Sequence, residues 1–185
     1  MPFNFIKTKI EGLTIIEPRK FPDGRGFFME TYKRTDFVNA GIDLDFVQDN
    51  HSCSSKGVLR GLHFQNKGFE QGKLVRVTRG SVWDVAVDLR KESTTYGEWI
   101  GVELTEENGR LFYLPPGFAH GFLTLSDNTH FLYKCTAEYA PNAEGGLRWN
   151  DADIGVDWPL NGIMPIFSDK DLELPFLREL KLGSL

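Results

Sequence analysis

The chain has 185 residues, a length that suits one domain with a substantial buried core. Its hydrophobic content of 41% and charged content of 25% are typical of a globular protein. The net charge is −5 and no basic run occurs, which argues against nucleic acid or an anionic membrane surface as a partner. The two cysteines lack the spacing of a metal site and no apolar leader opens the chain, so we expect free thiols and a cytoplasmic location.

The first third of the chain predicts short strands and one helix. Strands are expected on both sides of a Pro-Asp-Gly turn and again before a polar loop, at 13–17, 26–32 and 46–50. The segment 34–40 is predicted to be helical, with Thr35 as its cap and Gly41 at its end. The polar residues 52–56 are predicted to form a loop.

From Gly57 onward the sequence favours short strands at regular spacing, which is typical of a sandwich or barrel. The later strands are expected at 73–78, 82–89, 99–104, 111–114, 121–125 and 130–136. Within 82–89, apolar residues alternate with Asp84 and Asp88, so we predict a half-buried antiparallel strand. The tail 140–185 is less regular, with one or two short helices expected near its end. We predict a single all-β domain over 1–185.

A guanidinium, an imidazole and an ammonium lie close together in the stretch 57–73. An arginine fork suits phosphate, histidine moves protons near neutral pH, and lysine can hold a developing oxyanion. Strict strand alternation would place Arg60 and His63 on opposite faces, but Gly61 between them permits a bulge that brings both to one pocket. The alternative is structural, because a lone strand histidine is usually a core residue and Lys73 alone is usually a solvated charge. Together they indicate proton chemistry on a phosphorylated or nucleotide-linked substrate.

Two segments resemble the halves of the cupin motif, which implies a small jelly-roll β-barrel. The first is Gly57 followed after five residues by His63, and the second is the stretch 115–120, which ends in a histidine. Cupins usually bind a metal through two histidines of the first half, an acidic residue and the histidine of the second half. Here Gln65 stands in place of the second histidine, and Glu70 in the acidic position leaves a poor ligand set, so we predict no metal.

Two further residues have both a structural and a catalytic interpretation. Tyr133 alternates with Phe131 and Cys135 as a core tyrosine would, but it could also donate a proton across a pocket from His63. Asp171 completes a Ser-x-x-Asp pattern that closes a helix N-terminus, and it is equally suited to orient a catalytic histidine. Sequence spacing leaves these alternatives open.

Taken together, motifs along nearly the whole chain resemble the dTDP-4-dehydrorhamnose 3,5-epimerase family of nucleotide-sugar metabolism. The matching segments are 24–30, 46–52, 57–63, 71–76, 84–90, 116–122, 131–134, 150–151 and 168–171. The resemblance implies a cofactor-independent reaction in which a proton beside the C4 ketone is removed and returned on the other face. His63 would be the base, paired with Asp171 or with the neighbouring Asp169. Tyr133 would return the proton and Lys73 would stabilise the enolate oxygen.

The same resemblance implies a substrate pocket and a homodimer. Arg25 and Arg60 would bind the diphosphate, and the other implied positions are Phe28, Glu30, Gln48, Asn50, His120, Tyr139, Glu144 and Lys170. Gln48 and Asn50 would hold the nucleotide end and Tyr139 would stack near thymine. The N-terminal strands of the family cross to the partner, so Arg25, Phe28 and Glu30 would serve the neighbouring site.

The favoured function is therefore epimerisation at C3 and C5 of dTDP-4-dehydro-6-deoxy-D-glucose to dTDP-4-dehydro-L-rhamnose. A single-carbon epimerase or a ketoisomerase acting on another dTDP-ketosugar is the main alternative. A metal-dependent cupin oxygenase is a second one, against which Gln65 argues. A sugar- or nucleotide-binding module without catalysis is the third. No Gly-x-Gly-x-x-Gly fingerprint of a dinucleotide site is present, which agrees with a reaction that needs no redox cofactor.

Overall fold

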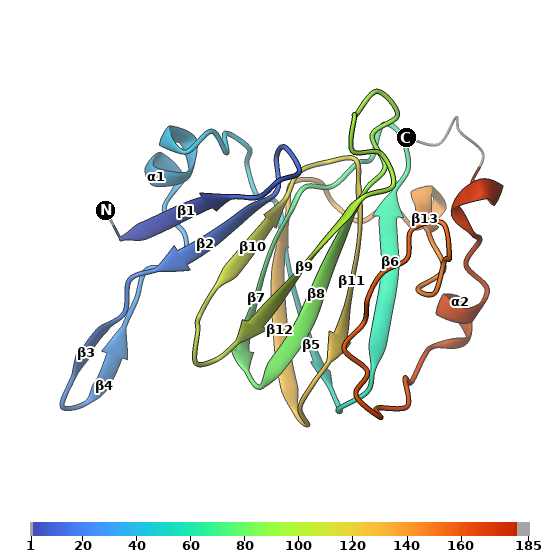
Figure 1. Ribbon diagram of the computed structural model, residues 1–185. Helices are drawn as coiled ribbons and strands as arrows, with labels where there is room; N and C mark the ends of the chain where they lie inside the picture. The colour runs from blue at the N-terminus through green and yellow to red at the C-terminus, as the bar shows by residue number, and fades with distance from the viewer. Residues whose placement is uncertain (1, 181–185) are drawn as a thin grey trace.

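Two antiparallel sheets face each other in the computed structural model, which describes residues 2–180 (Figure 1). The larger sheet contains, in spatial order, β1 (Phe3–Lys7), β2 (Thr14–Pro18), β10 (Leu111–Leu114), β7 (Lys73–Arg79), β12 (Thr129–Cys135) and β5 (Gln48–Ser54). The smaller sheet contains β13 (Glu144–Gly146), β6 (Leu59–Gln65), β11 (Phe118–Thr124), β8 (Ser81–Asp88) and β9 (Trp99–Thr105). A separate hairpin of β3 (Phe21–Asp23) and β4 (Gly26–Phe28) projects beyond the sheets. The helices are short: α1 (Arg34–Asn39), α2 (Asp169–Leu172) and the 3-10 turns η1 (Pro141–Ala143) and η2 (Leu177–Glu179).

The space between the sheets is filled by the apolar faces of the strands. Val75, Phe112 and Phe131 of the larger sheet pack against Val82 and Phe122 of the smaller one, and all five are at most 4% exposed. Full burial of such a side chain contributes about 1.5–3 kcal/mol each. The many phenylalanines of the sequence therefore serve mainly to fill the core. This core fixes the position of one sheet relative to the other, and a polar cavity, described below, lies at one end of the space between them.

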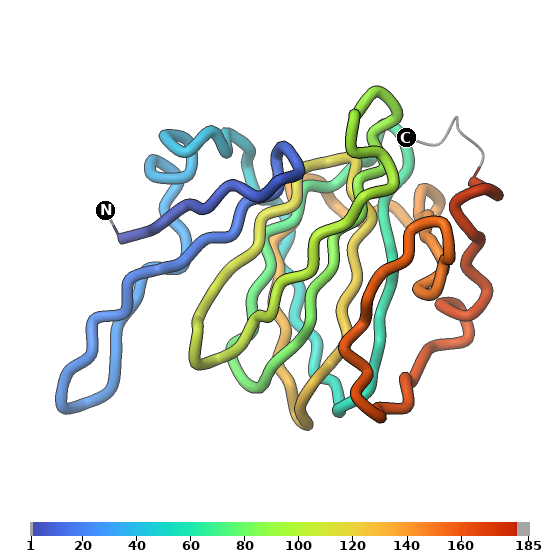
Figure 2. Tube along the Cα trace, in the orientation of Figure 1, coloured from blue at the N-terminus to red at the C-terminus, as the bar shows by residue number. Residues whose placement is uncertain are grey.

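The tail after β13 covers the outer face of the smaller sheet (Figure 2). Leu147 and Trp158 of the tail pack on Val85 of β8, which is also fully buried. The prediction of a half-buried strand was therefore wrong, because β8 lies between β11 and β9 with a layer on each face. Its aspartates, Asp84 and Asp88, are both 0% exposed.

A buried carboxylate needs hydrogen-bond partners, and Asp88 has three. Arg90, Ser93 and Thr95 donate to its oxygens at 2.6–2.9 Å. Burial would raise the pKa of Asp88, but the hydrogen bonds from Arg90, Ser93 and Thr95 outweigh it and lower the pKa to about 2. The carboxylate thus anchors the loop that follows β8.

The N-terminal part departs from the predictions in four places. Strand β4 ends at Phe28, short of the predicted strand over 26–32. Strand β1 was not predicted at all, and it pairs with β2 along its length. The residue that caps α1 is Lys33 rather than Thr35, and it makes no side-chain cap hydrogen bond. Strand β5 continues to Ser54, through part of the predicted loop, because it pairs with β12 over its whole length. Long-range pairing here overrides a local polar composition.

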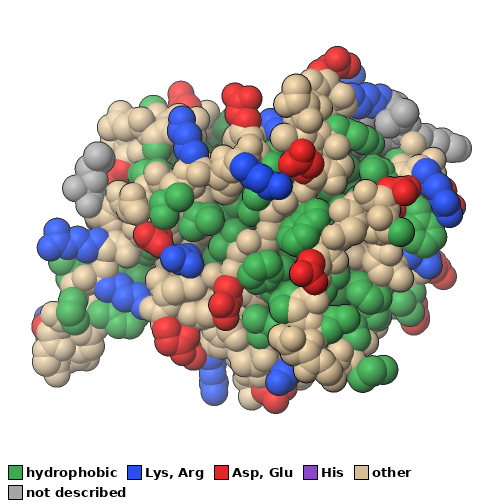
Figure 3. Space-filling view, viewed as in Figure 1, with side chains coloured by type: hydrophobic (Ala, Val, Ile, Leu, Met, Phe, Trp, Pro, Cys, Tyr) green, Lys and Arg blue, Asp and Glu red, His purple; other side chains and the backbone are tan. Residues whose placement is uncertain are grey.

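On the face shown in Figure 3, acidic and basic side chains are interspersed with hydrophobic ones, and neither kind of charge gathers in a large patch. Among residues 2–180, no helix has the length and apolar character needed to cross a membrane.

Candidate active site

A polar cavity opens between the two sheets, at the end where the apolar filling stops. Its volume is about 380 Å³, and it adjoins a second hollow of about 320 Å³. Both are lined by Asn50, His63, Lys73, Tyr133 and Glu144, so they form one continuous space. The first also contains Arg60, His120, Lys170 and Asp171, and the second contains Gln48 and Tyr139. The predicted site residues from Gln48 onward therefore all meet in this space.

The predicted bulge in β6 is confirmed. His63 pairs with His120 in the register and Arg60 pairs with Phe122, so two residues of β6 oppose Gly121 alone. Gly61 has a φ of +113°, and a Cβ atom there would lie 2.7 Å from the Gly121 Cα and the His120 carbonyl oxygen. The bulge turns both Arg60 and His63 towards the cavity.

Replacing Gly61 by alanine is expected to lower the free energy of unfolding by at least about 2 kcal/mol, because positive-φ strain and a backbone clash add together. Gly24→Ala is the matched control, since nothing lies within 4 Å of a Cβ at that position. It should change stability by less than about 0.5 kcal/mol. Urea unfolding of both variants measures the difference, and equal midpoints would contradict the role given to Gly61.

His63 and Asp171 form a tight pair at the cavity wall. His63 Nε2 is 2.6 Å from Asp171 Oδ1, and Ser168 Oγ donates to Asp171 Oδ2 at 2.7 Å. The Ser168 side chain also accepts a hydrogen bond from the Asp171 amide and caps α2, so the capping and orienting interpretations of Asp171 are both correct. Burial would raise the pKa of Asp171, but the hydrogen bonds from His63 and Ser168 outweigh it and lower the pKa. Asp169 is exposed, which leaves the buried Asp171 as the partner of the imidazole.

A second histidine–aspartate pair lies deeper in the same wall. His120 Nε2 is 2.9 Å from Asp84 Oδ2, and both residues are buried. Burial lowers the pKa of His120 despite the neighbouring carboxylate, and burial raises the pKa of Asp84. Asp84 was not predicted as a site residue. Its position among the apolar residues of a strand was the available clue, because a buried carboxylate must find a partner.

The larger sheet supplies the opposite wall of the cavity through Lys73 and Tyr133. Burial lowers the pKa of Lys73, and burial also raises the pKa of Tyr133. Within the described residues, neither the Lys73 ammonium nor the Tyr133 hydroxyl has a hydrogen-bond partner. A cation of reduced pKa and a protonated phenol thus face the His63 imidazole from the other sheet, free to bind a ligand.

The rim of the cavity is tied together by polar contacts. Tyr139 Oη donates to Glu144 Oε2 at 2.6 Å, and the Lys170 ammonium forms an ion pair with the same carboxylate. Gln48 accepts a hydrogen bond from the Tyr139 amide at 2.8 Å and donates one to Asn50 at 3.0 Å. These contacts join β5, β13 and α2, three segments far apart in the sequence.

The residues at the positions of cupin metal ligands have other partners here. Gln65 accepts a hydrogen bond from the Ala140 amide at 2.9 Å, and Glu70 accepts one from the Gly68 amide at 2.7 Å within its own loop. Across the described part of the chain, no three His, Cys, Asp or Glu side chains already surround one point.

Three predicted binding residues lie away from the cavity. Arg25 is in the turn of the β3–β4 hairpin, where its guanidinium pairs with Asp23 at 2.7 Å. Phe28 is 66% exposed at the end of β4, and Glu30 follows it. None of the three lines the cavity of the same chain.

Comparisons with known proteins identify the family of this fold and site. The model of the dTDP-4-dehydrorhamnose 3,5-epimerase family matches residues 7–179. The enzyme of that name from Methanothermobacter thermautotrophicus is 56% identical over 178 residues, which cover 96% of each chain. The one from Salmonella typhimurium is 53% identical, over 93% of this chain and 94% of that one. The 3,5-epimerase of Legionella pneumophila, solved in complex with dTDP-4-keto-L-rhamnose, superimposes with a TM-score of 0.93 at 47% identity, over 97% of this chain and 95% of that one. The predicted all-β, cupin-type jelly roll is thereby confirmed, and the chain belongs to the dTDP-4-dehydrorhamnose 3,5-epimerase family.

Proposed function

We propose that this chain epimerises dTDP-4-dehydro-6-deoxy-D-glucose at C3 and C5 to dTDP-4-dehydro-L-rhamnose, and that His63 is the base. The observation that carries the proposal is the His63–Asp171 pair of 2.6 Å, which faces Lys73 and Tyr133 across one cavity. A base on one wall and an acid on the other are what inversion of a carbon requires.

The reaction needs only proton transfers. Because Nε2 of His63 is held by Asp171, the other ring nitrogen is free to take the proton from the carbon beside the C4 ketone. The electrons of the broken C–H bond move into an enolate, whose oxygen is stabilised by the Lys73 ammonium. Tyr133 then gives its phenolic proton to the opposite face of the carbon and regains one from solvent. His63 releases the proton that it took to solvent, and a second round at the other carbon completes the double epimer.

The cavity also suits the charged end of the substrate. The chain has a net charge of −5, yet the cavity gathers Arg60, Lys73 and Lys170. We assign Arg60 to the diphosphate, Gln48 and Asn50 to the nucleotide, and Tyr139 to a position near thymine. His120, Glu144 and Lys170 complete the pocket in this proposal.

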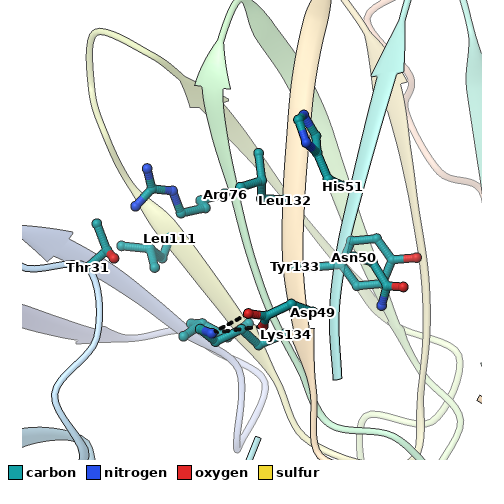
Figure 4. Close-up of a pocket in the computed structure, with 10 residues that line it drawn as sticks. Thr31, Asp49, Asn50, His51, Arg76, Leu111, Leu132, Tyr133 and Lys134 are labelled. Carbon is teal, nitrogen blue, oxygen red and sulfur yellow. Dashed lines mark hydrogen bonds and ion pairs between the residues drawn. The ribbon is translucent and has the colours of Figure 1, made fainter. Parts of the chain in front are cut away.

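We further propose a homodimer in which the β3–β4 hairpin completes the partner's site. The hairpin projects from the body and exposes Phe27 by 58% and Phe28 by 66%, which suits insertion into another chain. The outer face of the larger sheet has a hollow of about 340 Å³ near the end of the hairpin. Its lining includes Thr31, Leu111 and Arg76, and also Asn50 and Tyr133, whose side chains extend away from those three (Figure 4). A second copy packed there would bring its hairpin to the cavity.

Mixing two inactive variants tests this exchange. If Arg25 serves the partner's site, refolding Arg25→Ala together with His63→Asn gives heterodimers with one intact site each. Random pairing should then restore about one quarter of the wild-type sites. The activity of the mixture is measured against each variant alone, and a mixture as inactive as its components would place Arg25 in its own chain's site.

The tail belongs to the same functional unit in this proposal. It supplies Asp171 to the cavity and covers β8, so we treat 1–185 as one domain and expect it to act in the cytoplasm.

Proton NMR of the dTDP-4-ketosugar with the chain in heavy water tests the proposed reaction. Deuterium at both C3 and C5 is expected. Deuterium at one carbon only would replace the proposal with a single-carbon epimerase, and deuterium at neither, with dTDP bound, would leave a binding module.

A further inference from the structure

The Arg60 guanidinium is held from the facing sheet by the hydroxyl of a serine. Ser54 lies at the end of β5 in the larger sheet, and Arg60 lies near the start of β6 in the smaller one. Arg60 Nε donates to Ser54 Oγ at 3.3 Å. The hydrogen bond therefore bridges the two sheets at the wall of the cavity, which Arg60 lines.

Strand β5 fixes the position of this hydroxyl. Burial alternates along the strand, and Ser54 shares the inward face with Gln48 and Asn50, which line the cavity. Ser54 is 7% exposed and is the register partner of Thr129 on β12. Its side chain is short and its backbone is held by strand pairing, so the hydroxyl has few positions available. An exposed arginine is thus tied to a point that does not move with it.

A hydroxyl orients a guanidinium without neutralising its charge. Arg90, for comparison, is held by the carboxylate of Asp88 at 2.7 Å, and its charge is compensated there. Within residues 2–180, Arg60 forms no ion pair, and its hydrogen-bond partner is the neutral Ser54. The full positive charge of Arg60 therefore remains available to an anion in the cavity.

We infer that Ser54 is a positioning residue for substrate binding, which holds Nε of Arg60 so that the two terminal nitrogens face the diphosphate. The N–H groups of a guanidinium form a rigid planar fork that matches two oxygens of a phosphate. With Nε engaged by Ser54, the end of the fork formed by the two terminal nitrogens is left for the ligand. An arginine that is already oriented also loses less side-chain freedom when the ligand binds. The inference rests on the proposed function, in which Arg60 binds the diphosphate.

Calorimetric titrations of dTDP into the wild type, Ser54→Ala, Arg60→Ala and the double variant test this role. Ser54→Ala should weaken dTDP binding by about two- to twelvefold, the usual cost of ordering one flexible side chain on binding. Adding Ser54→Ala to Arg60→Ala should cause no further loss, because the hydroxyl then has no guanidinium to orient. Ser55→Ala is the matched control, since this neighbouring serine is exposed and does not line the cavity. Its dTDP affinity should equal that of the wild type.

Steady-state kinetics with the dTDP-4-ketosugar add a second readout. Ser54→Ala should raise KM by the same factor and leave kcat within about twofold of the wild type, because the diphosphate is held alike in the ground state and the transition state. An unchanged dTDP affinity in Ser54→Ala, or an equal loss with and without Arg60, would overturn the positioning role and leave the proposed reaction standing. A wild type that does not bind dTDP would overturn both.

Discussion

Replacing His63 by asparagine is expected to lower the rate of epimerisation by about 10²- to 10⁴-fold, the usual contribution of a positioned general base. Asparagine keeps a polar group near Asp171, 2.6 Å from the imidazole in the wild type, but it cannot accept a proton from carbon. The rates at which the C3 and C5 protons exchange with solvent should fall together, because one base serves both carbons. The affinity for dTDP should change little, since the nucleotide end contacts other residues.

The measurement is deuterium incorporation at C3 and C5, followed by NMR, with dTDP binding followed by calorimetry. His130→Asn is the matched control. It removes an imidazole from the face of β12 that points away from the cavity, and the sugar protons should still exchange with solvent at the wild-type rate. Exchange that persists in His63→Asn at the wild-type rate would transfer the role of base to another group.

The part of the site that lies on β6 could be predicted from local sequence, because the effect of a glycine on the backbone conformation is confined to its immediate neighbours. Gly61 between Arg60 and His63 indicates a bulge, and the bulge occurs where it was expected. The choice between Asp169 and Asp171 could not be made in the same way. It depends on how the tail, more than 100 residues further on, docks against β6, where Asp171 lies 2.6 Å from His63 across a sequence separation of 108 residues.

The errors have a common physical cause. Alternation along β8 correctly predicted that Asp84 and Asp88 share one face, but not what covers that face. Periodicity reports which side chains point the same way, whereas burial depends on the layers that distant segments add. The missed β1 and the extension of β5 to Ser54 have the same origin, since both depend on pairing with a distant strand.

Replacing Lys73 by methionine is expected to lower kcat by about 10²- to 10³-fold, the usual cost of removing one group that stabilises an oxyanion. Methionine approximates the volume of the lysine stem and removes the charge. Because the enolate forms during proton removal, the rate of proton exchange and the rate of inversion at carbon should fall by the same factor. Tyr133→Phe should behave differently, with inversion slowed more than exchange, because tyrosine acts only in the return of the proton.

The pH profile separates the charge of Lys73 from its packing. Burial lowers the pKa of Lys73, so the active ammonium form should be lost on the alkaline side below the ordinary lysine value of about 10.4. Lys73→Arg keeps a cation that does not titrate in this range, and its alkaline limb should move to higher pH. The exposed Lys67 provides the control, since Lys67→Met should leave both kcat and the pH profile unchanged. An alkaline limb that stays in place in Lys73→Arg would assign that titration to another group, and full activity in Lys73→Met would remove Lys73 from the reaction.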